Sequence, residues 1–346
     1  MTTGENWRRA ATFDYPEWIP CGAGFSPITW RTYREELDRV HLDHPRLFPG
    51  FVPGANGYYD EMPAVHRQGE RFRDNWGCVW YNAHEGLEGQ VVESPLADWD
   101  RLADYRAPDP LTQFERGEEP RDWEQTARDV EQARAAGGLV GGSGERLFDR
   151  LYFLRGFENL MMDFATDDPH LPALLDILEQ YETVLIDKWL SLGVEVMGFH
   201  TDIGTQRGLM ISPAKFRQYL KPLFTRLFQR CHAGGALVAL SSDGCLLEIV
   251  DDLVDCGVTT HDPQLRANTL PGIVQAYKGK LCANVDLDRQ GFPFMTPEEI
   301  REQVREVVGE MAAPEGGLMV SGSVWGEDVP LSNIVALVEA LEEFCF

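Results

Sequence analysis

The feature that most constrains the fold is an alternation of short apolar segments with amphipathic helical segments over residues 120–346. The apolar segments are helix-separated and almost free of charge, which is typical of parallel strands joined by crossover helices. Strands of this kind are buried on both faces of their sheet. The predicted strands lie within residues 138–144, 194–199, 236–244, 258–264, 280–286 and 317–325.

A doubly wound open sheet and a closed (β/α)8 barrel both fit this alternation, and the number of repeated units favours the barrel. No GxGxxG sequence follows a strand and no Walker A sequence is present, so a nucleotide cofactor loses support. We therefore predict an α/β fold, a (β/α)8 TIM barrel formed by residues 111–346. Residues 1–110 are rich in Pro, Gly and aromatic residues and are predicted to form an irregular N-terminal extension packed on that barrel, within one structural domain.

Two helix starts carry clear signals. Ser212 precedes Pro213, a pair typical of an N-cap and first helical residue. Thr296 is followed three residues later by Glu299, which indicates a capping box.

The charge balance narrows the choice of partners. The chain has 31 basic and 56 acidic side chains, a formal charge of −25, whereas nucleic acids and anionic membranes attract positive charge. We therefore expect no nucleic acid and no membrane partner. The N-terminal segment lacks a signal-peptide core, and no run of about 18 apolar residues occurs. The seven cysteines stand singly, without a CxxC pair, so a reducing, cytoplasmic location is expected.

Polar side chains gather where the predicted strands end, which is where (β/α)8 barrels carry their chemistry. The catalytic candidates are His200, Asp202, Asp243 and His261. His200 and Asp202 are two positions apart and share one face of an extended segment. Simpler roles stay open: a histidine is often a hydrogen-bonded core residue, and an aspartate often caps a helix or braces a turn.

Further residues at these strand ends are candidates for binding a substrate. Aromatic rings offer stacking surfaces, and polar groups offer hydrogen bonds, although each is also found in cores and turns. His and carboxylate side chains are also zinc ligands, so His200, Asp202 and Asp243 are a candidate zinc site, although no HxH or HExxH spacing supports it. The substrate-binding candidates are Gln206, Arg207, Ser241, Asp286, Ser323, Trp325, Trp80 and Tyr81.

A series of segments resembles the uroporphyrinogen decarboxylase superfamily, which includes cobalamin-dependent methyltransferases. The segments are DIGTQRGLMISPAKFRQYLKP, HAGGALVALSSDG, DLVDCGV, NVDLD, TPEEIREQV and DVPLSNIVAL. The resemblance covers residues 140–346 and implies a (β/α)8 barrel with a deep cleft. It departs from the porphyrinogen decarboxylases, which carry an RQAGR segment that is absent here and a histidine where this chain has Ser323. The zinc-binding His-x-Cys pair and later Cys of the coenzyme M methyltransferases align with Ser241, Asp243 and Ser323.

With both of those residue sets missing, the resemblance implies the branch that demethylates small methyl donors. The expected activity is a methyltransferase that moves a methyl group from an O- or N-methyl donor, such as a methoxylated aromatic compound, to a corrinoid protein. The corrinoid would be carried by that partner. Two other functions stay open: a cofactor-free decarboxylase or lyase acting on a small carboxylic acid, and a non-catalytic ligand-binding relative. The oligomeric state is also open, with a homodimer among the alternatives.

Overall fold

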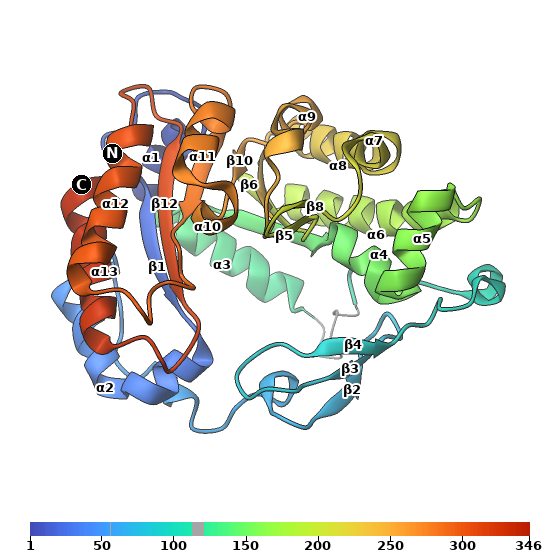
Figure 1. The fold of residues 1–346 in the computed structure, drawn as a ribbon, viewed down its shortest axis with the longest axis horizontal. Helices are drawn as coiled ribbons and strands as arrows, with labels where there is room; N and C mark the ends of the chain where they lie inside the picture. Colours follow the sequence, from blue (N-terminus) through green and yellow to red (C-terminus); the bar gives the residue numbers. More distant parts are fainter. Residues whose placement is uncertain (56, 113–120) are drawn as a thin grey trace. The chain divides into compact units, whose positions relative to one another are not determined.

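The computed structural model describes residues 1–55, 57–112 and 121–346 (Figure 1). Residues 113–120, at the start of the predicted barrel segment, lie outside the described residues. The described chain divides into two compact units whose segments alternate along the sequence. The first unit contains residues 1–5, 71–81 and 89–261, and the second contains residues 6–70, 82–88 and 262–346.

Parallel strands form the sheet of the first unit, in the hydrogen-bonded order β10-β9-β6-β5. These strands are β5 (Gly141–Arg146), β6 (Val196–His200), β9 (Leu237–Ser241) and β10 (Thr260–His261). The helices of this unit are α3 (Trp123–Ala135), α4 (Leu147–Arg155), α5 (Phe157–Thr166), α6 (Leu171–Ser191), α7 (Pro213–Lys215), α8 (Lys221–Ala233) and α9 (Val250–Cys256), with a π-helical turn η4 (Phe216–Leu220) and 3-10 turns η3 (Trp99–Asp104) and η5 (Leu247–Ile249).

Apolar side chains hold these helices against the sheet. Helices α6 and α8 pack side by side (Figure 1), and Phe199 of β6 contacts Phe228 of α8 with ring centroids 5.1 Å apart. Both rings are fully buried. Their burial orients β6 with its apolar residues inward, so that its last residue emerges from the core.

Two small antiparallel elements complete the first unit. One is a three-stranded sheet in the order β2-β3-β4, and the other is the hairpin β7–β8 directly after β6. Their bounds are β2 (Arg71–Arg73), β3 (Val79–Tyr81), β4 (Gln90–Glu93), β7 (Gly204–Thr205) and β8 (Gly208–Leu209). The hairpin fixes the chain direction immediately beyond the end of β6.

The second unit has its own parallel strands, in the order β11-β12-β1, with Cys21 opposite Val320 and Phe25 opposite Val324. Helices α12 and α13 pack on each other in this unit (Figure 1). The elements are β1 (Cys21–Phe25), α2 (Pro27–Asp43), η1 (Gly57–Tyr59), η2 (Ala64–His66), α10 (Leu265–Asn268), α11 (Leu270–Tyr277), β11 (Cys282–Asp286), α12 (Pro297–Met311), β12 (Leu318–Val324) and α13 (Leu331–Cys345). Helix α1 (Thr3–Ala11) begins the chain.

The elements predicted beyond residue 120 are present, and both helix caps are confirmed: the Ser212 hydroxyl accepts from Lys215 N, and Thr296 and Glu299 form a capping box. Gly156 adopts a φ of 87° between α4 and α5 and separates the two helices. That left-handed conformation is open to glycine and ends the first helix.

The N-terminal segment is more regular than its composition indicated. It contains helices α1 and α2, and strand β1 pairs in parallel with β12. The sequence CGAGF carries little strand propensity, because glycine and alanine are depleted in strands. Within the described ranges, no helix is long and apolar enough to cross a membrane.

Candidate active site

Strand β6 delivers His200 and Asp202 to the end of the first unit's sheet. Thr201 between them is buried, and its hydroxyl accepts a 2.9 Å hydrogen bond from the backbone N–H of Phe148. His200, the last residue of β6, is exposed, and Asp202 just beyond the strand is partly buried. His200 lies between Arg146 of β5 and Ser241 of β9 in the strand register.

Asp202 joins two other aspartates. Its backbone N–H donates to Asp149 Oδ2 at 2.7 Å, and its own Oδ1 accepts from the backbone N–H of Asp243 at 3.0 Å. Burial raises the pKa of Asp202 to about 6, and the nearby negative charge of Asp149 adds to the shift. The Asp202 carboxyl therefore holds a proton over much of the mildly acidic range and titrates near pH 6.

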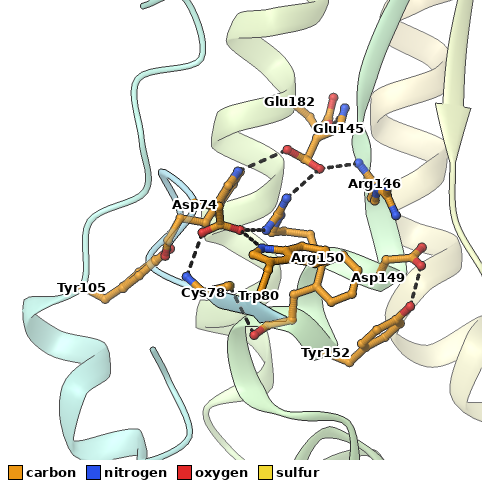
Figure 2. Close-up of polar contacts among 12 residues, drawn as sticks. Asp74, Cys78, Trp80, Tyr105, Glu145, Arg146, Asp149, Arg150, Tyr152 and Glu182 are labelled. Carbon is orange, nitrogen blue, oxygen red and sulfur yellow. Dashed lines mark hydrogen bonds and ion pairs between the residues drawn. The ribbon is translucent and has the colours of Figure 1, made fainter. Parts of the chain in front are cut away.

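Asp149 and Tyr152, both on α4, complete this cluster. The Tyr152 hydroxyl donates to Asp149 Oδ1 at 2.6 Å, and the pKa of Tyr152 is raised by burial and by the Asp149 charge (Figure 2). The sequence prediction missed both residues, because they lie within a helical pattern read as core. In the structure Asp149 is only 3% exposed, a burial that no signal in the sequence indicated.

His200 is poised as a neutral imidazole. Its pKa is lowered, first because the surrounding protein displaces water from the ring, and then because the positive charge of Arg146 disfavours a second cation. The charge of Asp149 opposes this effect without cancelling it. A neutral imidazole provides one hydrogen-bond donor and one acceptor.

A buried ionic network joins α4 to the end of β5 (Figure 2). The fully buried Arg150 forms ion pairs with Asp74 Oδ2 at 3.3 Å and with Glu145 Oε1 at 3.1 Å. Glu145 Oε1 also accepts from the backbone N–H of Arg146 at 2.8 Å. Because Arg150 follows Asp149 in α4, this network fixes both the start of that helix and the end of β5.

Glu182 of α6 closes the network. Its Oε1 accepts from the backbone N–H of Glu145 at 2.6 Å, and burial together with the Glu145 charge raises the pKa of Glu182 to about 8. A side chain on Gly144 would not fit here, since its Cβ would lie 2.4 Å from the Phe199 ring and 2.9 Å from Glu182 Oε2. The glycine-rich sequence of β5 is therefore needed to admit a buried carboxyl beneath the strand.

The aromatic candidates of this unit differ in their surroundings. Trp80 is 1% exposed, its Nε1 donates to Asp74 Oδ2 at 2.8 Å, and its ring packs against Phe153 at 4.8 Å between centroids. The Trp80 ring therefore supports the network instead of offering an open stacking surface. Tyr81, the next residue, is 39% exposed.

The remaining candidates of the first unit lie around the strand ends. Gln206 and Arg207 are exposed at the turn of the β7–β8 hairpin, where the Arg207 N–H donates to the Thr205 hydroxyl at 3.2 Å. His261 is 1% exposed, and burial lowers its pKa to about 3, so the ring is neutral. Its burial agrees with the core role left open for a histidine at this position.

Three candidates belong to the second unit. Asp286 is buried at the end of β11 and pairs with Arg289 at 3.5 Å. Trp325 is 55% exposed after β12, and the Arg289 guanidinium lies 6.0 Å from the centre of its ring. Ser323 is partly buried in β12, opposite Gly24 of β1. These residues lie at the ends of β11 and β12, two strands of the second unit.

The proposed zinc ligands were tested against the geometry. Among residues 1–55, 57–112 and 121–346, no three His, Cys, Asp or Glu side chains are arranged to hold a metal ion. One oxygen of Asp202 already accepts a backbone hydrogen bond from Asp243.

Parallel strands alternating with helices, with ionisable side chains at the strand ends, define the class of α/β barrel proteins. A family model described as Uroporphyrinogen decarboxylase (URO-D) matches residues 79–344. The chain belongs to this family. Both the predicted resemblance and the predicted barrel class are confirmed, and the described residues contain seven parallel strands.

Among solved structures, a methyltransferase from Methanosarcina mazei has a similar fold, with a TM-score of 0.66, 17% sequence identity and coverage of 99% of each chain. A D-psicose 3-epimerase from Clostridium cellulolyticum H10, with D-tagatose, is similar over 64% of this chain and 83% of its own, with 12% identity and a TM-score of 0.39. No curated protein gave a match to the sequence.

Proposed function

We propose that the protein is a methyltransferase that moves a methyl group from a small O- or N-methyl donor, such as a methoxylated aromatic compound, to a corrinoid held by a partner protein. The observation that carries the proposal is the Asp202 carboxyl, which burial and Asp149 keep protonated up to a pH of about 6. An alkoxide or amine leaving group requires such a proton donor. The whole-length fold similarity to a methyltransferase supports the same class of reaction.

The hydrogen bonds of Asp202 indicate which oxygen carries the proton. Oδ1 accepts the N–H of Asp243, so the proton resides on Oδ2, where it can be donated. As the bond between the methyl carbon and the donor oxygen breaks, its electron pair stays on that oxygen, and Asp202 Oδ2 gives it the proton. The reduced corrinoid supplies the nucleophile that takes the methyl group.

Neighbouring residues have supporting roles in this proposal. The neutral His200 hydrogen-bonds the donor oxygen or nitrogen, and Asp149 maintains the high pKa of Asp202 through its charge. Asp243 holds the Asp202 carboxyl through its backbone N–H, and Ser241, next to His200 in the register, offers a hydroxyl. Gln206 and Arg207 are exposed on the following hairpin, where they would contact the outer part of a donor.

The test is methylation of a reduced corrinoid protein, followed by its absorbance, with a panel of methoxyarenes and methylamines. Wild-type protein should produce the methylated corrinoid with at least one donor. Asp202→Asn keeps the shape but removes the proton, so its rate should fall by roughly 10²- to 10⁴-fold. The wild-type rate should also decline as the pH rises above about 6, because Asp202 loses its proton.

Asp14→Asn, at an exposed residue outside the site, is the matched control and should keep the full rate. Absence of the methylated spectrum with every donor, or an unchanged rate for Asp202→Asn, would contradict the proposal.

A second candidate is a cofactor-free decarboxylase acting on a small carboxylic acid. It is favoured by the proximity of Arg146, a cation that suits a substrate carboxylate, to the protonated Asp202, which could protonate a carbanion. Release of CO₂ in the absence of any corrinoid would favour this candidate over methyl transfer.

A further inference from the structure

Two cysteines that are far apart in the sequence meet in the second unit. Cys21 is the first residue of β1, and Cys345 is the last residue of α13. The backbone N–H of Ile19 donates to the carbonyl of Cys345 at 2.9 Å, which holds the segment before β1 against the end of the helix.

The side chain of Cys21 points to the same helical turn. Its Sγ lies 3.9 Å from the carbonyl oxygen of Leu341, four residues before Cys345. In an α-helix this carbonyl accepts the N–H of the residue four positions later. The Cys21 thiol is therefore next to the turn that carries Cys345. Both cysteines are in the reduced form.

The end of α13 is held in place by further contacts. Phe346 stacks on Trp18 with ring centroids 6.2 Å apart, and His44 Nδ1 lies 2.8 Å from Glu342 Oε2. Joining two cysteines requires that their Cα atoms already lie within about 7 Å. These contacts hold the segment before β1 and the end of α13 close to each other.

We propose that Cys21 and Cys345 form a modification site, a reversible disulfide that fastens α13 to β1 when the protein meets an oxidised low-molecular-weight thiol such as oxidised glutathione. This inference is independent of the proposed methyltransferase activity. It assigns a joint role to two residues whose isolated positions in the sequence indicated only free thiols.

The exchange proceeds in two balanced steps. The Cys21 thiolate, the more accessible of the two, attacks the glutathione disulfide, forming a mixed disulfide and releasing one glutathione thiolate. The Cys345 thiolate then attacks the Cys21 sulfur and releases the second glutathione. Overall, two protein thiols lose two electrons and two protons, and one glutathione disulfide becomes two thiols. The neighbouring Cys345 thiol, and then burial, raise the pKa of Cys21, so the reaction is expected to be faster at higher pH.

The test uses the folded full chain at pH 8.5 with oxidised glutathione, followed by blocking with N-ethylmaleimide, tryptic digestion without reductant and mass spectrometry. Trypsin places Cys21 in peptide 10–31 and Cys345 in peptide 306–346, each with one cysteine. The expected product is the pair of peptides joined by one disulfide and separated by dithiothreitol.

Cys21→Ser and Cys345→Ser should each abolish the joined pair, whereas Cys231→Ser, at a buried cysteine of the other unit, should leave it unchanged. Three results would overturn the proposal. In the first, both cysteines of the treated native chain carry N-ethylmaleimide, and in the second Cys21 retains glutathione while Cys345 carries N-ethylmaleimide. In the third, the disulfide-joined peptides form only when the chain is unfolded in urea.

Discussion

At the scale of single residues, Asp202 combines a structural and a chemical feature. One oxygen braces the backbone of Asp243, as an aspartate after a strand often does, while burial and Asp149 raise the pKa of the carboxyl to about 6. A group kept protonated by its surroundings reduces the stability of the fold once it ionises. The ionised Asp202 therefore lowers the free energy of unfolding, a cost that is typical of a residue whose shifted pKa serves a reaction.

The stability of Asp202→Asn should depend on pH. Below a pH of about 4, Asp202 is protonated in both folded and unfolded chains, so its ionisation has no effect. Between pH 4 and 6 the unfolded carboxyl ionises while the folded one stays protonated, and wild-type stability declines relative to the variant. Above pH 6 the difference is complete, at up to about 3 kcal/mol for a shift of two pKa units.

Urea denaturation of both proteins at pH 4.5, 6 and 8 measures this difference. The advantage of Asp202→Asn should grow with pH between the first two values and then level off. Asp14→Asn, at an exposed position, should differ from wild type in stability by the same amount at all three pH values. If Asp202→Asn were less stable than wild type at pH 8, the ionised Asp202 would be stabilised by its contacts, and the prediction would be wrong.

Sequence reasoning found half of this cluster. His200, Asp202 and Asp243 follow apolar strands directly, and the strand periodicity marks that position. Asp149 lies inside a helix, and no periodic pattern distinguishes an acid facing the site from one facing solvent. Its two hydrogen-bond partners, Asp202 N and Tyr152 Oη, become visible only when α4 is packed beside the end of β6.

At the scale of elements, the β5–α4 junction is the structural base of the site. Arg150 is fully buried between Asp74 and Glu145, and its guanidinium lies 4.7 Å from the centre of the Trp76 ring. Glu145 in turn holds the backbone of Arg146. A buried guanidinium with two carboxylate partners fixes orientation, because each partner left alone would be an uncompensated buried charge.

Arg150→Met should therefore be strongly destabilising. Methionine keeps a long unbranched side chain but leaves Asp74 and Glu145 without their common cation. Breaking such a buried ion pair costs roughly 3–5 kcal/mol. Arg226→Met is the matched control: Arg226 bonds Glu179 through two nitrogens on the surface, and its loss should cost about 1 kcal/mol or less. Urea unfolding midpoints compare the two, and equal losses would contradict the role assigned to the network.

The elements themselves were predictable to different degrees. Strands and helices beyond residue 120 follow clear periodicities, and the packing of Phe199 on Phe228 shows that the apolar faces meet as those patterns indicated. Strand β1 was missed because Cys21–Phe25 owes its pairing to β12, a partner about 300 positions away. The proximity of Cys21 to Cys345 has the same origin. Contacts made by the chain's distant ends leave no local periodic signal.

At the scale of the whole molecule, a formal charge of −25 acts on every residue at once. Such a net charge favours solubility and disfavours binding to nucleic acid. In the folded chain the acidic groups lie closer together than in the unfolded chain, so their mutual repulsion destabilises the fold. Local ion pairs oppose this repulsion. Arg230 with Asp187 and Lys221 with Asp255 are examples on exposed helical surfaces, where each pair contributes little.

The two effects respond oppositely to salt, so salt reveals which one dominates. Screening at about 0.3 M NaCl shortens the reach of charges to several ångströms, which weakens long-range repulsion more than contact pairs. With 25 more acidic than basic groups, repulsion should prevail, and the Tm should rise as NaCl increases from 20 to 300 mM. Differential scanning calorimetry measures the Tm. KCl should raise the Tm as much as NaCl does, because both salts screen charge equally. Glycerol at the same osmolarity does not screen charge and should not reproduce the dependence of the Tm on salt concentration. A Tm that falls with NaCl would mean that surface pairs such as Arg226–Glu179 outweigh the net charge in stabilising the fold.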